Sequence, residues 1–251
     1  MSRRVLITAG ASGIGLCMAQ TFMAAGDRVR VTDIDEAALA ALPDGIRGSH
    51  VNAADPDEMD AFFAELAAEW GGLDVAVANA GIKGPTTPIE EMDPDEWREC
   101  IAVCLDGAML LARGAARLMK PAGSGVMIFI SSTAGLYPYR FRSSYVAAKF
   151  GVIGLMQTVQ AELGPHGIRA NAICPGSVEG PRIDRVIAAE AGAKGLTEDA
   201  VRQAYASGTA LRQLTRAQDV ADTAFHLASD KARMIAGQAI AVDGMTINPD
   251  P

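Results

Sequence analysis

Tyr145 and Lys149 are the pair of side chains best suited to proton transfer at a carbon–oxygen bond. They stand four positions apart in a segment whose pattern predicts a helix over Ser143–Leu163, so both side chains lie on one face of it. A tyrosine has an ordinary pKa of about 10, and a neighbouring cation makes it a better base near neutral pH by stabilising the phenolate. Ser132 ends an apolar run shortly before, and its hydroxyl could hold a substrate oxygen. Because Y-x-x-x-K is common on helix surfaces, these residues indicate an acid–base site only together with the motifs that precede them.

A glycine-rich segment from Thr8 to Gly15 joins a predicted strand to a predicted helix. Gly13 and Gly15 remove side chains where a pyrophosphate must approach backbone N–H groups, and the helix N-terminus adds a partial positive charge. The spacing G-x-x-G-x-G, which begins at Gly10, is weak evidence alone. Its position between a strand and a helix is the context that favours a dinucleotide site.

Asp33 ends the second predicted strand, about 20 residues beyond the glycines, where a carboxylate can accept hydrogen bonds from the adenosine ribose. It would repel a 2′-phosphate, and no arginine follows it directly. The sequence therefore predicts NAD(H) rather than NADP(H). The alternative is that Asp33 or Asp35 only caps the next helix, and one of them can do so while the other binds ribose.

Short β-branched runs alternate with longer amphipathic stretches along the chain. The runs predict strands at Arg4–Thr8, Arg28–Thr32, Ile46–Val51, Asp74–Ala78, Gly125–Ser131, Ile168–Ile173 and Ala239–Val242. The stretches predict helices at Gly13–Ala25, Asp35–Ala41, Pro56–Trp70, Pro94–Met119, Ser143–Leu163 and Arg216–Ser229. Several runs are apolar almost throughout, as in parallel strands buried on both faces. We therefore expect an α/β fold in a single domain over residues 1–251: a doubly wound, mostly parallel, seven-stranded Rossmann-like sheet with helices on both faces.

One segment, about residues 177–206, departs from this alternation. It contains two short helical patterns, Ile183–Ala191 and Glu198–Tyr205, after the sixth predicted strand. A long excursion at the carboxyl end of a sheet strand is where an α/β fold binds its ligand, so we expect a lid over the substrate. A surface insertion is the alternative.

Composition excludes several classes of function. A net charge of −8 and a pI of about 4.9 argue against a nucleic-acid partner, which requires a basic face. We expect no membrane span, because no uninterrupted apolar run is long enough, and no signal peptide. The cysteines are Cys17, Cys100, Cys104 and Cys174, with no C-x-x-C pair. We therefore expect free thiols, no metal site and a reducing, cytoplasmic location.

The motifs together resemble the short-chain dehydrogenase/reductase family from Val5 to about Gly244. The matching pieces, in the family's order, are Thr8…Gly13-Ile14-Gly15, Asp33, Asn79-Ala80-Gly81, Ser131-Ser132, Tyr145…Lys149, Pro175-Gly176 and Val242-Asp243-Gly244. The resemblance implies an NAD(H)-dependent oxidoreductase that interconverts a secondary alcohol and a ketone. It also implies a homotetramer built on the helices near Pro94–Met119 and Ser143–Leu163 and on the last strand.

The resemblance assigns roles to individual residues. Ser132 would bind the substrate oxygen, Tyr145 would act as acid and base, and Lys149 would support the phenolate and hold the nicotinamide ribose. Asn79 and the turn after it would line the adenosine side and support the sheet. The residues implied in cofactor binding are Gly10, Ser12, Gly13, Ile14, Gly15, Asp33, Asn52, Asn79, Gly81, Tyr145, Lys149, Pro175, Gly176 and Val178.

Four positions depart from the family pattern. Ala9 stands where a glycine is usual, although Gly10 is adjacent. Cys104 stands at the position of the asparagine that supports a water-linked proton path from the lysine, so the proton relay must differ. Asn52 replaces an aspartate but could still contact adenine, and Glu179-Gly180 replaces a threonine. We interpret Cys104 as a small core residue, paired at i, i+4 with Cys100, rather than as a nucleophile.

Basic residues gather in the segments expected around the substrate. Lys83 follows the Asn79 turn, Arg140 and Arg142 precede Tyr145, and Arg182 lies in the lid. Arginine binds carboxylates through two parallel hydrogen bonds, so Lys83, Arg140 and Arg182 predict an acidic substrate such as a hydroxy acid, keto acid or sugar acid. The alternative is that these cations are solvated or help to pair subunits.

Two other functions fit the same residues. A cofactor-binding protein that senses NAD(H) without turnover is favoured by Ala9 and Cys104, and disfavoured by the intact Ser132, Tyr145 and Lys149. A reductase of neutral carbonyl substrates would use the same three residues in the opposite direction.

Overall fold

One parallel sheet organises the molecule, whose computed structural model describes residues 2–248 without the side chains of Arg182, Ala189, Glu190, Ala193 and Lys194. In the described residues the sheet has seven strands in the order β3-β2-β1-β4-β5-β6-β7, and every pairing is parallel. The strands are β1 (Arg4–Thr8), β2 (Arg28–Asp33), β3 (Ile46–His50), β4 (Val75–Ala78), β5 (Gly125–Ile130), β6 (Ile168–Pro175) and β7 (Ala239–Val242). This confirms the predicted sheet. Strand order reverses between β1 and β4, which is where such folds bind ligands.

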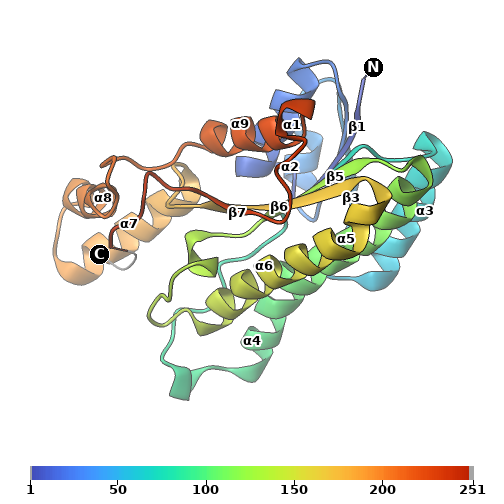
Figure 1. Ribbon diagram of the computed structural model, residues 1–251. Coiled ribbons are helices and arrows are strands. Elements are labelled where there is room, and N and C mark those ends of the chain that lie inside the picture. The colour runs from blue at the N-terminus through green and yellow to red at the C-terminus, as the bar shows by residue number, and fades with distance from the viewer. Residues whose placement is uncertain (1, 249–251) are drawn as a thin grey trace.

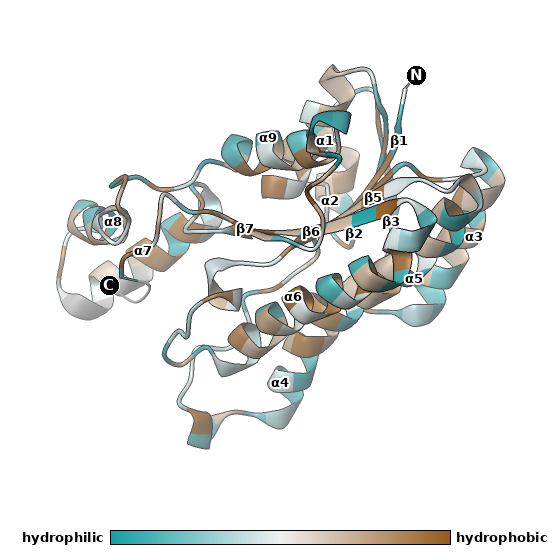
Figure 2. Ribbon diagram, in the orientation of Figure 1, coloured by the Kyte–Doolittle hydropathy of each residue, from teal (hydrophilic) through white to brown (hydrophobic). Residues whose placement is uncertain are grey.

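Helices cover both faces of the sheet. They are α1 (Gly13–Ala24), α2 (Glu36–Ala40), α3 (Pro56–Trp70), α4 (Pro94–Ile101), α5 (Gly107–Met119), α6 (Ser143–Leu163), α7 (Pro181–Lys194), α8 (Glu198–Ser207) and α9 (Ala217–Leu227). Helices α1 and α9 pack on one face and α3, α5 and α6 on the other (Figure 1). Figure 2 shows hydrophobic positions along the strands and hydrophilic ones on the outer surface of helices such as α3 and α9.

Alternation along β1 divides the core into two layers. Val5 and Ile7 are buried against α1 and α9, whereas Leu6 is buried against α3 and α5. Side chains of successive strand residues point to opposite faces, so an apolar strand supplies both layers at once. This is why the apolar runs of the sequence locate the strands well.

The segment predicted as one helix over Pro94–Met119 is interrupted. Between α4 and α5 the chain makes a π-helical turn over Ala102–Asp106, where Cys104 is buried. Gly107 follows, and a Cβ there would lie only 3.0 Å from the carbonyl oxygen of Ala53, so the chain passes very close to the loop after β3. A π-turn takes up an extra residue within a helix without breaking it, and helical periodicity in the sequence does not reveal it.

Helices α7 and α8 stand apart from the others at the left of Figure 1. They extend the two predicted helical patterns, and they share a small apolar cluster of their own that includes Ile187, Ala191 and Val201. Arg202 and Asp184 form an ion pair between them. The segment therefore has internal support separate from the main core.

Arg30 joins the edge of the sheet to α3. Its side chain is 3% exposed, and its guanidinium lies 2.6 Å from Glu65, 2.9 Å from Glu69 and 2.9 Å from the Ser49 hydroxyl. The guanidinium also lies 5.6 Å from the centre of the Phe62 ring. Strand β2, strand β3 and helix α3 are thus held together by one buried cation.

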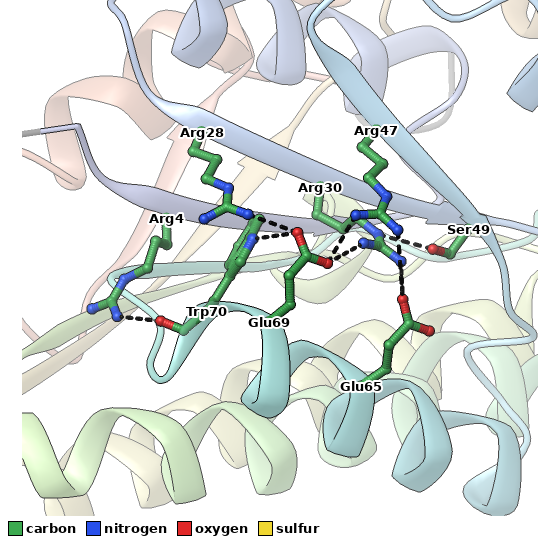
Figure 3. A network of polar contacts seen from close by, with 8 residues as sticks. All are labelled: Arg4, Arg28, Arg30, Arg47, Ser49, Glu65, Glu69 and Trp70. Carbon is green, nitrogen blue, oxygen red and sulfur yellow. Dashed lines mark hydrogen bonds and ion pairs between the residues drawn. The ribbon is translucent and has the colours of Figure 1, made fainter.

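The Glu69 carboxylate pairs with three arginines from strands β2 and β3. Figure 3 shows its carboxylate between Arg28, Arg30 and Arg47, with Arg28 at 2.7 Å and Arg47 at 3.0 Å. Desolvation opposes ionisation of this carboxyl, but the charges of Arg47, Arg30 and Arg28 hold its pKa below the usual range. Glu69 therefore stays ionised wherever the fold is formed near neutral pH.

The turn after β1 contains a strained residue. Ala9 has φ of 48°, a left-handed conformation that residues other than glycine rarely adopt. The carbonyl groups of Thr8 and Ala9 both accept hydrogen bonds from the Asn79 amide, at 3.0 and 2.9 Å. These bonds hold the backbone in a conformation that the alanine disfavours.

Replacing Arg30 by alanine should lower the free energy of unfolding by about 2 kcal/mol, because the buried contacts disappear while both glutamates keep access to water. The matched change Arg47→Ala, at a side chain 62% exposed, should cost about 0.5 kcal/mol. Urea unfolding of the two variants measures both values. Equal losses would show that burial of Arg30 is not what anchors α3.

Ala9→Gly should raise the free energy of unfolding by about 0.5–1 kcal/mol, because relief of the left-handed strain exceeds the added entropy of the unfolded chain. Ala11, in the same turn, has no positive φ, so Ala11→Gly should instead destabilise by about 0.5–1 kcal/mol. Thermal or urea unfolding compares the pair. A loss of stability in both variants would contradict the strain at Ala9.

Candidate active site

The predicted site residues come together where the strands end. The segments that follow β1, β2, β4, β5 and β6 all leave the same edge of the parallel sheet. Residues distant in sequence therefore surround the point at which the strand order reverses.

The glycine-rich turn fits closely against its neighbours. The N–H of Gly10 donates to the Thr32 carbonyl at 3.0 Å. A Cβ at Gly15 would lie 2.3 Å from the Ala9 carbonyl oxygen and 2.7 Å from the Asn79 amide nitrogen, so only glycine fits there. Gly13 has φ of +53° and open space where a Cβ would project. The turn is therefore packed against its neighbours at Gly15 and open at Gly13, where a ligand can approach.

Asn79 supports this turn rather than standing free beside it. Besides its amide bonds to the two carbonyls, its N–H and that of Ala80 both lie 3.1 Å from the Thr8 hydroxyl. The expected structural role of Asn79 is therefore visible as hydrogen bonds between the ends of β1 and β4. Gly81 follows, and a Cβ there would lie 3.4 Å from the Lys149 ammonium.

Asp33 and Asp35 accept hydrogen bonds from different segments, the glycine-rich turn and helix α2. Asp35 is the N-cap of α2 and accepts a hydrogen bond from the Ala38 N–H. Asp33 accepts from the Ala11 N–H at 3.1 Å and from the N–H of Ile34 at 2.9 Å, so its half-buried carboxylate braces the glycine-rich turn. The helix cap is thus Asp35, which leaves Asp33 at the rim of the turn.

The first turn of α1 is suited to an anion. Its N-cap, Ser12, makes no side-chain capping bond, and no acidic residue lies in the first turn. Backbone N–H groups at a helix N-terminus bind phosphate well, and Gly13 and Gly15 keep side chains out of the approach. These residues fit the pyrophosphate of a dinucleotide. Asn52, by contrast, uses its side-chain oxygen on the Ala54 N–H at 3.0 Å.

Lys149 is buried beside Tyr145. Its side chain is 3% exposed, and its ammonium donates to the Ile130 carbonyl at 2.8 Å. The ammonium nitrogen lies 5.7 Å from the centre of the Tyr145 ring, as their spacing on α6 predicts. The Lys149 carbonyl in turn accepts from the Ser131 hydroxyl at 2.9 Å. Helix α6 is therefore tied to the end of β5 at this residue.

Ser132 begins the short turn Thr133–Gly135 that lies against α6. Its hydroxyl accepts a hydrogen bond from the Ala134 N–H at 3.1 Å. A Cβ at Gly135 would lie 2.7 Å from the Lys149 carbonyl oxygen, so the turn sits directly on the helix that carries Tyr145. The hydroxyl proton of Ser132 can still be donated to a substrate oxygen.

Cys104, at the position of the family's asparagine, lies near Lys149 and contacts its surroundings through a thiol instead of an amide. Its thiol is 3.5 Å from the Ile82 carbonyl, and it would lie 3.6 Å from a Cβ at Gly81. The pKa of neighbouring Cys100 is raised by its hydrogen bond with Cys104 and by burial. The raised pKa of Cys100 and the burial of both thiols support the interpretation of this pair as core residues rather than nucleophiles.

The segment expected to contact the nicotinamide is held by residues from the end of the chain. The Gly176 N–H donates to the Val242 carbonyl at 3.1 Å, and Val178 forms a parallel bridge with Thr215. A Cβ at Gly176 would lie 3.0 Å from that of Asp243. No sequence motif identifies Thr215, because its role is to pair with Val178, which is distant in sequence.

The expected substrate cations have different surroundings. Lys83 and Arg140 are exposed, and Arg140 lines an open hollow with Pro138, Tyr139 and Asn248. Arg182 lies in α7, but its side chain is outside the described residues. Arg142, which sequence reasoning left out of the candidate site set, lies with its guanidinium carbon 5.0 Å from the centre of the Tyr145 ring.

An adjoining hollow lies between the Thr133–Gly135 turn and the segment after β6. It is lined by Thr133, Tyr139, Ser177, Tyr205, Thr209 and Asn248. Thr133 and Tyr139 share a hydrogen bond of 2.8 Å between their hydroxyls. Sequence reasoning missed Thr209 and Asn248, which carry no motif.

Among the side chains that the structure describes within residues 2–248, no group of His, Cys, Asp and Glu is arranged to hold a metal ion. No helix in the same range is both long and apolar enough to cross a membrane.

Known proteins resemble the chain over nearly its whole length. A family model described as Enoyl-(Acyl carrier protein) reductase matches residues 8–245. The chain is 35% identical to D-beta-hydroxybutyrate dehydrogenase of Rhizobium meliloti (strain 1021), over 97% of this chain and 98% of that protein. It is 36% identical to Cis-4-hydroxycyclohexanecarboxylate dehydrogenase of Sinomonas cyclohexanicum, over 96% of this chain and 95% of that protein. The crystal structure of levodione reductase superposes with a TM-score of 0.90 at 26% identity, covering 96% of each chain.

The family match covers the segments that the structure brings together at the site. The matched region runs from the glycine-rich turn through Tyr145 and Lys149 to the strand end at Asp243. The protein is an oxidoreductase that acts on CH–OH groups, and it belongs to the short-chain dehydrogenase/reductase family.

Proposed function

We propose that this protein is an NAD(H)-dependent dehydrogenase of a hydroxy acid, with Ser132, Tyr145 and Lys149 as its catalytic residues. The observation that carries the proposal is the buried ammonium of Lys149, held beside the Tyr145 ring at the edge of the sheet where the dinucleotide turn lies. A buried cation is costly unless partners offset its desolvation, and such buried ionisable groups cluster at functional sites. Intact catalytic residues favour turnover over a sensor.

The chain's own residues would handle the proton. The nicotinamide, when bound, supplies the acceptor or donor of a hydride at the substrate carbon. During oxidation Tyr145 takes the proton of the substrate hydroxyl, and during reduction it returns that proton to the carbonyl oxygen. Ser132 orients the same oxygen, and Lys149 stabilises the phenolate. With Cys104 in place of an amide, any onward proton path uses backbone groups and water.

Cofactor choice rests on Asp33. Its carboxylate at the rim of the glycine-rich turn would accept hydrogen bonds from the adenosine ribose and repel a 2′-phosphate. The N-terminus of α1 would hold the pyrophosphate, and Pro175, Gly176 and Val178 would contact the nicotinamide. These assignments give NAD(H) as the cofactor.

An acidic substrate is supported by charge. The chain carries a net charge of −8, so an anionic substrate requires local cations, and Lys83, Arg140 and Arg182 lie in segments around the site. Two relatives are named for dehydrogenation of hydroxy acids. Residues 177–206 would cover the substrate as a lid.

The proposal also covers the oligomeric state of the protein and its location in the cell. We infer a homotetramer, supported by the exposed apolar side chains Met109 on α5 and Phe150 on α6, 39% and 46% exposed. We also propose a cytoplasmic location, which the four free cysteines support because thiols stay reduced there.

Tyr145→Phe should lower kcat/KM about 10³-fold or more, because the acid–base group is removed, while the Kd for NADH stays within about twofold. Tyr137→Phe removes the same hydroxyl from an exposed tyrosine nearby and should leave both values unchanged. Steady-state kinetics and NADH fluorescence titration provide the measurements. NADH binding without turnover of any alcohol by the unaltered protein would instead identify a sensor.

With NAD⁺ the unaltered enzyme should show a kcat/KM about 100-fold higher than with NADP⁺. Asp33→Ser should reduce that ratio at least about tenfold, because the carboxylate that discriminates is removed. Asp35→Asn tests the neighbouring helix cap and should leave the ratio unchanged. A preference for NADP⁺ in the unaltered enzyme would overturn the cofactor assignment.

A further inference from the structure

Arg142 lies directly against the proposed acid–base residue. Its guanidinium carbon is 5.0 Å from the centre of the Tyr145 ring, closer than the Lys149 ammonium at 5.7 Å. An arginine over an aromatic face is attracted to it, and the attraction strengthens away from water. Arg142 is half-buried and its Nε atom is buried, so part of its guanidinium is shielded from water.

The backbone around Arg142 is built to hold that position. The preceding residue, Phe141, has φ of 60°, a strained conformation for a bulky residue, and its side chain is 54% exposed. The Phe141 carbonyl accepts from the Thr87 N–H at 2.9 Å, and the Arg142 guanidinium donates to the Lys83 carbonyl at 2.8 Å. Two bonds from the loop after β4 thus stabilise a strained turn, which is the kind of arrangement found at functional sites.

The two cations mark opposite ends of Tyr145 along α6. Arg142, the N-cap of α6, is three residues before the tyrosine, and Lys149 is four residues after it within the helix. Lys149 points to the end of β5, where its ammonium binds the Ile130 carbonyl. Arg142 instead donates to the Lys83 carbonyl, in the loop after β4. The two cations beside Tyr145 therefore bond to different segments, Lys149 to the end of β5 and Arg142 to the loop after β4.

We propose that Arg142 binds the carboxylate of the substrate and thereby selects hydroxy acids whose carboxylate is a few carbons from the reacting carbon. This inference rests on the proposed dehydrogenase function and names the residue that sets its substrate class. A guanidinium presents five N–H donors in a planar fork, so it can hold the Lys83 carbonyl and a carboxylate together. The substrate hydroxyl must lie within about 3 Å of the Tyr145 oxygen, which places a nearby carboxylate within reach of the cation stacked on that ring.

Because the chain is negatively charged overall, an anionic substrate needs a cation close to its carboxylate. A chain with net charge −8 repels anions at long range, and screening leaves short-range contacts to decide binding. A half-buried guanidinium interacts more strongly with an anion than exposed Lys83 or Arg140 can. Among the described cations Lys83, Arg140 and Arg142, it is therefore Arg142 that is best placed to distinguish an acid from its uncharged analogue.

The test compares Arg142→Gln and Arg142→Lys on matched acid and neutral substrates, with NAD⁺ saturating. The acids are 3-hydroxybutyrate and cis-4-hydroxycyclohexanecarboxylate, and the neutral partners are their methyl esters. Arg142→Gln should raise KM for the acid it uses at least about 30-fold while changing kcat/KM for the ester less than about threefold. Arg142→Lys should recover part of the loss, because charge returns without the fork. Arg117→Gln, which removes an exposed arginine at the end of α5, should match the unaltered enzyme.

Several outcomes would overturn the assignment. A fall in kcat of similar size for acid and ester would show that Arg142 positions Tyr145 and does not read the carboxylate. Retained KM for the acid in Arg142→Gln would show that another cation binds it. Either result leaves the dehydrogenase function intact, and Tyr145→Phe tests that function separately.

A binding experiment covers the case in which the enzyme oxidises only neutral alcohols. Butyrate and butanamide are titrated calorimetrically into the NADH-saturated enzyme. Tighter binding of butyrate, lost at least about tenfold in Arg142→Gln but not in Arg117→Gln, supports the anion site even though the hydroxy-acid function has failed. Equal binding of butyrate and butanamide by the unaltered enzyme overturns it.

Discussion

The buried ammonium of Lys149 is the interaction on which the arrangement of the site depends. An ammonium group taken from water must be given polar partners, and here the Ile130 carbonyl accepts its hydrogen bond at 2.8 Å. The backbone of the same residue accepts from Ser131, so side chain and main chain both tie α6 to the end of β5. Because Tyr145 lies one turn earlier on that helix, the tie also fixes where the phenol stands. The turn that begins at Ser132 packs on the helix at the same place.

The parallel sheet supplies the other half of the site. Its strand ends meet at one edge, and the reversal between β1 and β4 opens a space that Asn79 bridges with hydrogen bonds to Thr8 and Ala9. The glycine-rich turn is therefore held by a residue far away in sequence. It tolerates a strained alanine because these bonds, together with the Asp33 carboxylate on Ala11, hold its backbone from two sides.

Charge is distributed differently in the structural and functional parts of the molecule. At the outer edge of the sheet, Arg30 is buried among glutamates that neutralise it, so its positive charge serves the fold. At the site, Lys149 and Arg142 flank one tyrosine along a helix, and each also bonds to a backbone carbonyl. A carbonyl orients a cation without cancelling its charge, which leaves that charge available to a ligand. The two arrangements differ in whether the partner of a buried or half-buried cation cancels its charge.

The sequence by itself determined the strands, most of the helices and the pairing of Tyr145 with Lys149. These features depend on side-chain periodicity and on residues within one or two turns, so they are readable along the chain. It did not reveal the π-turn at Cys104, because an extra residue in a helix leaves the hydrophobic pattern almost unchanged. Nor did it select Arg142 over Arg140, or Thr215 as the partner of Val178. Those choices join segments far apart in sequence, and only the packing of the whole chain decides which side chains finally meet.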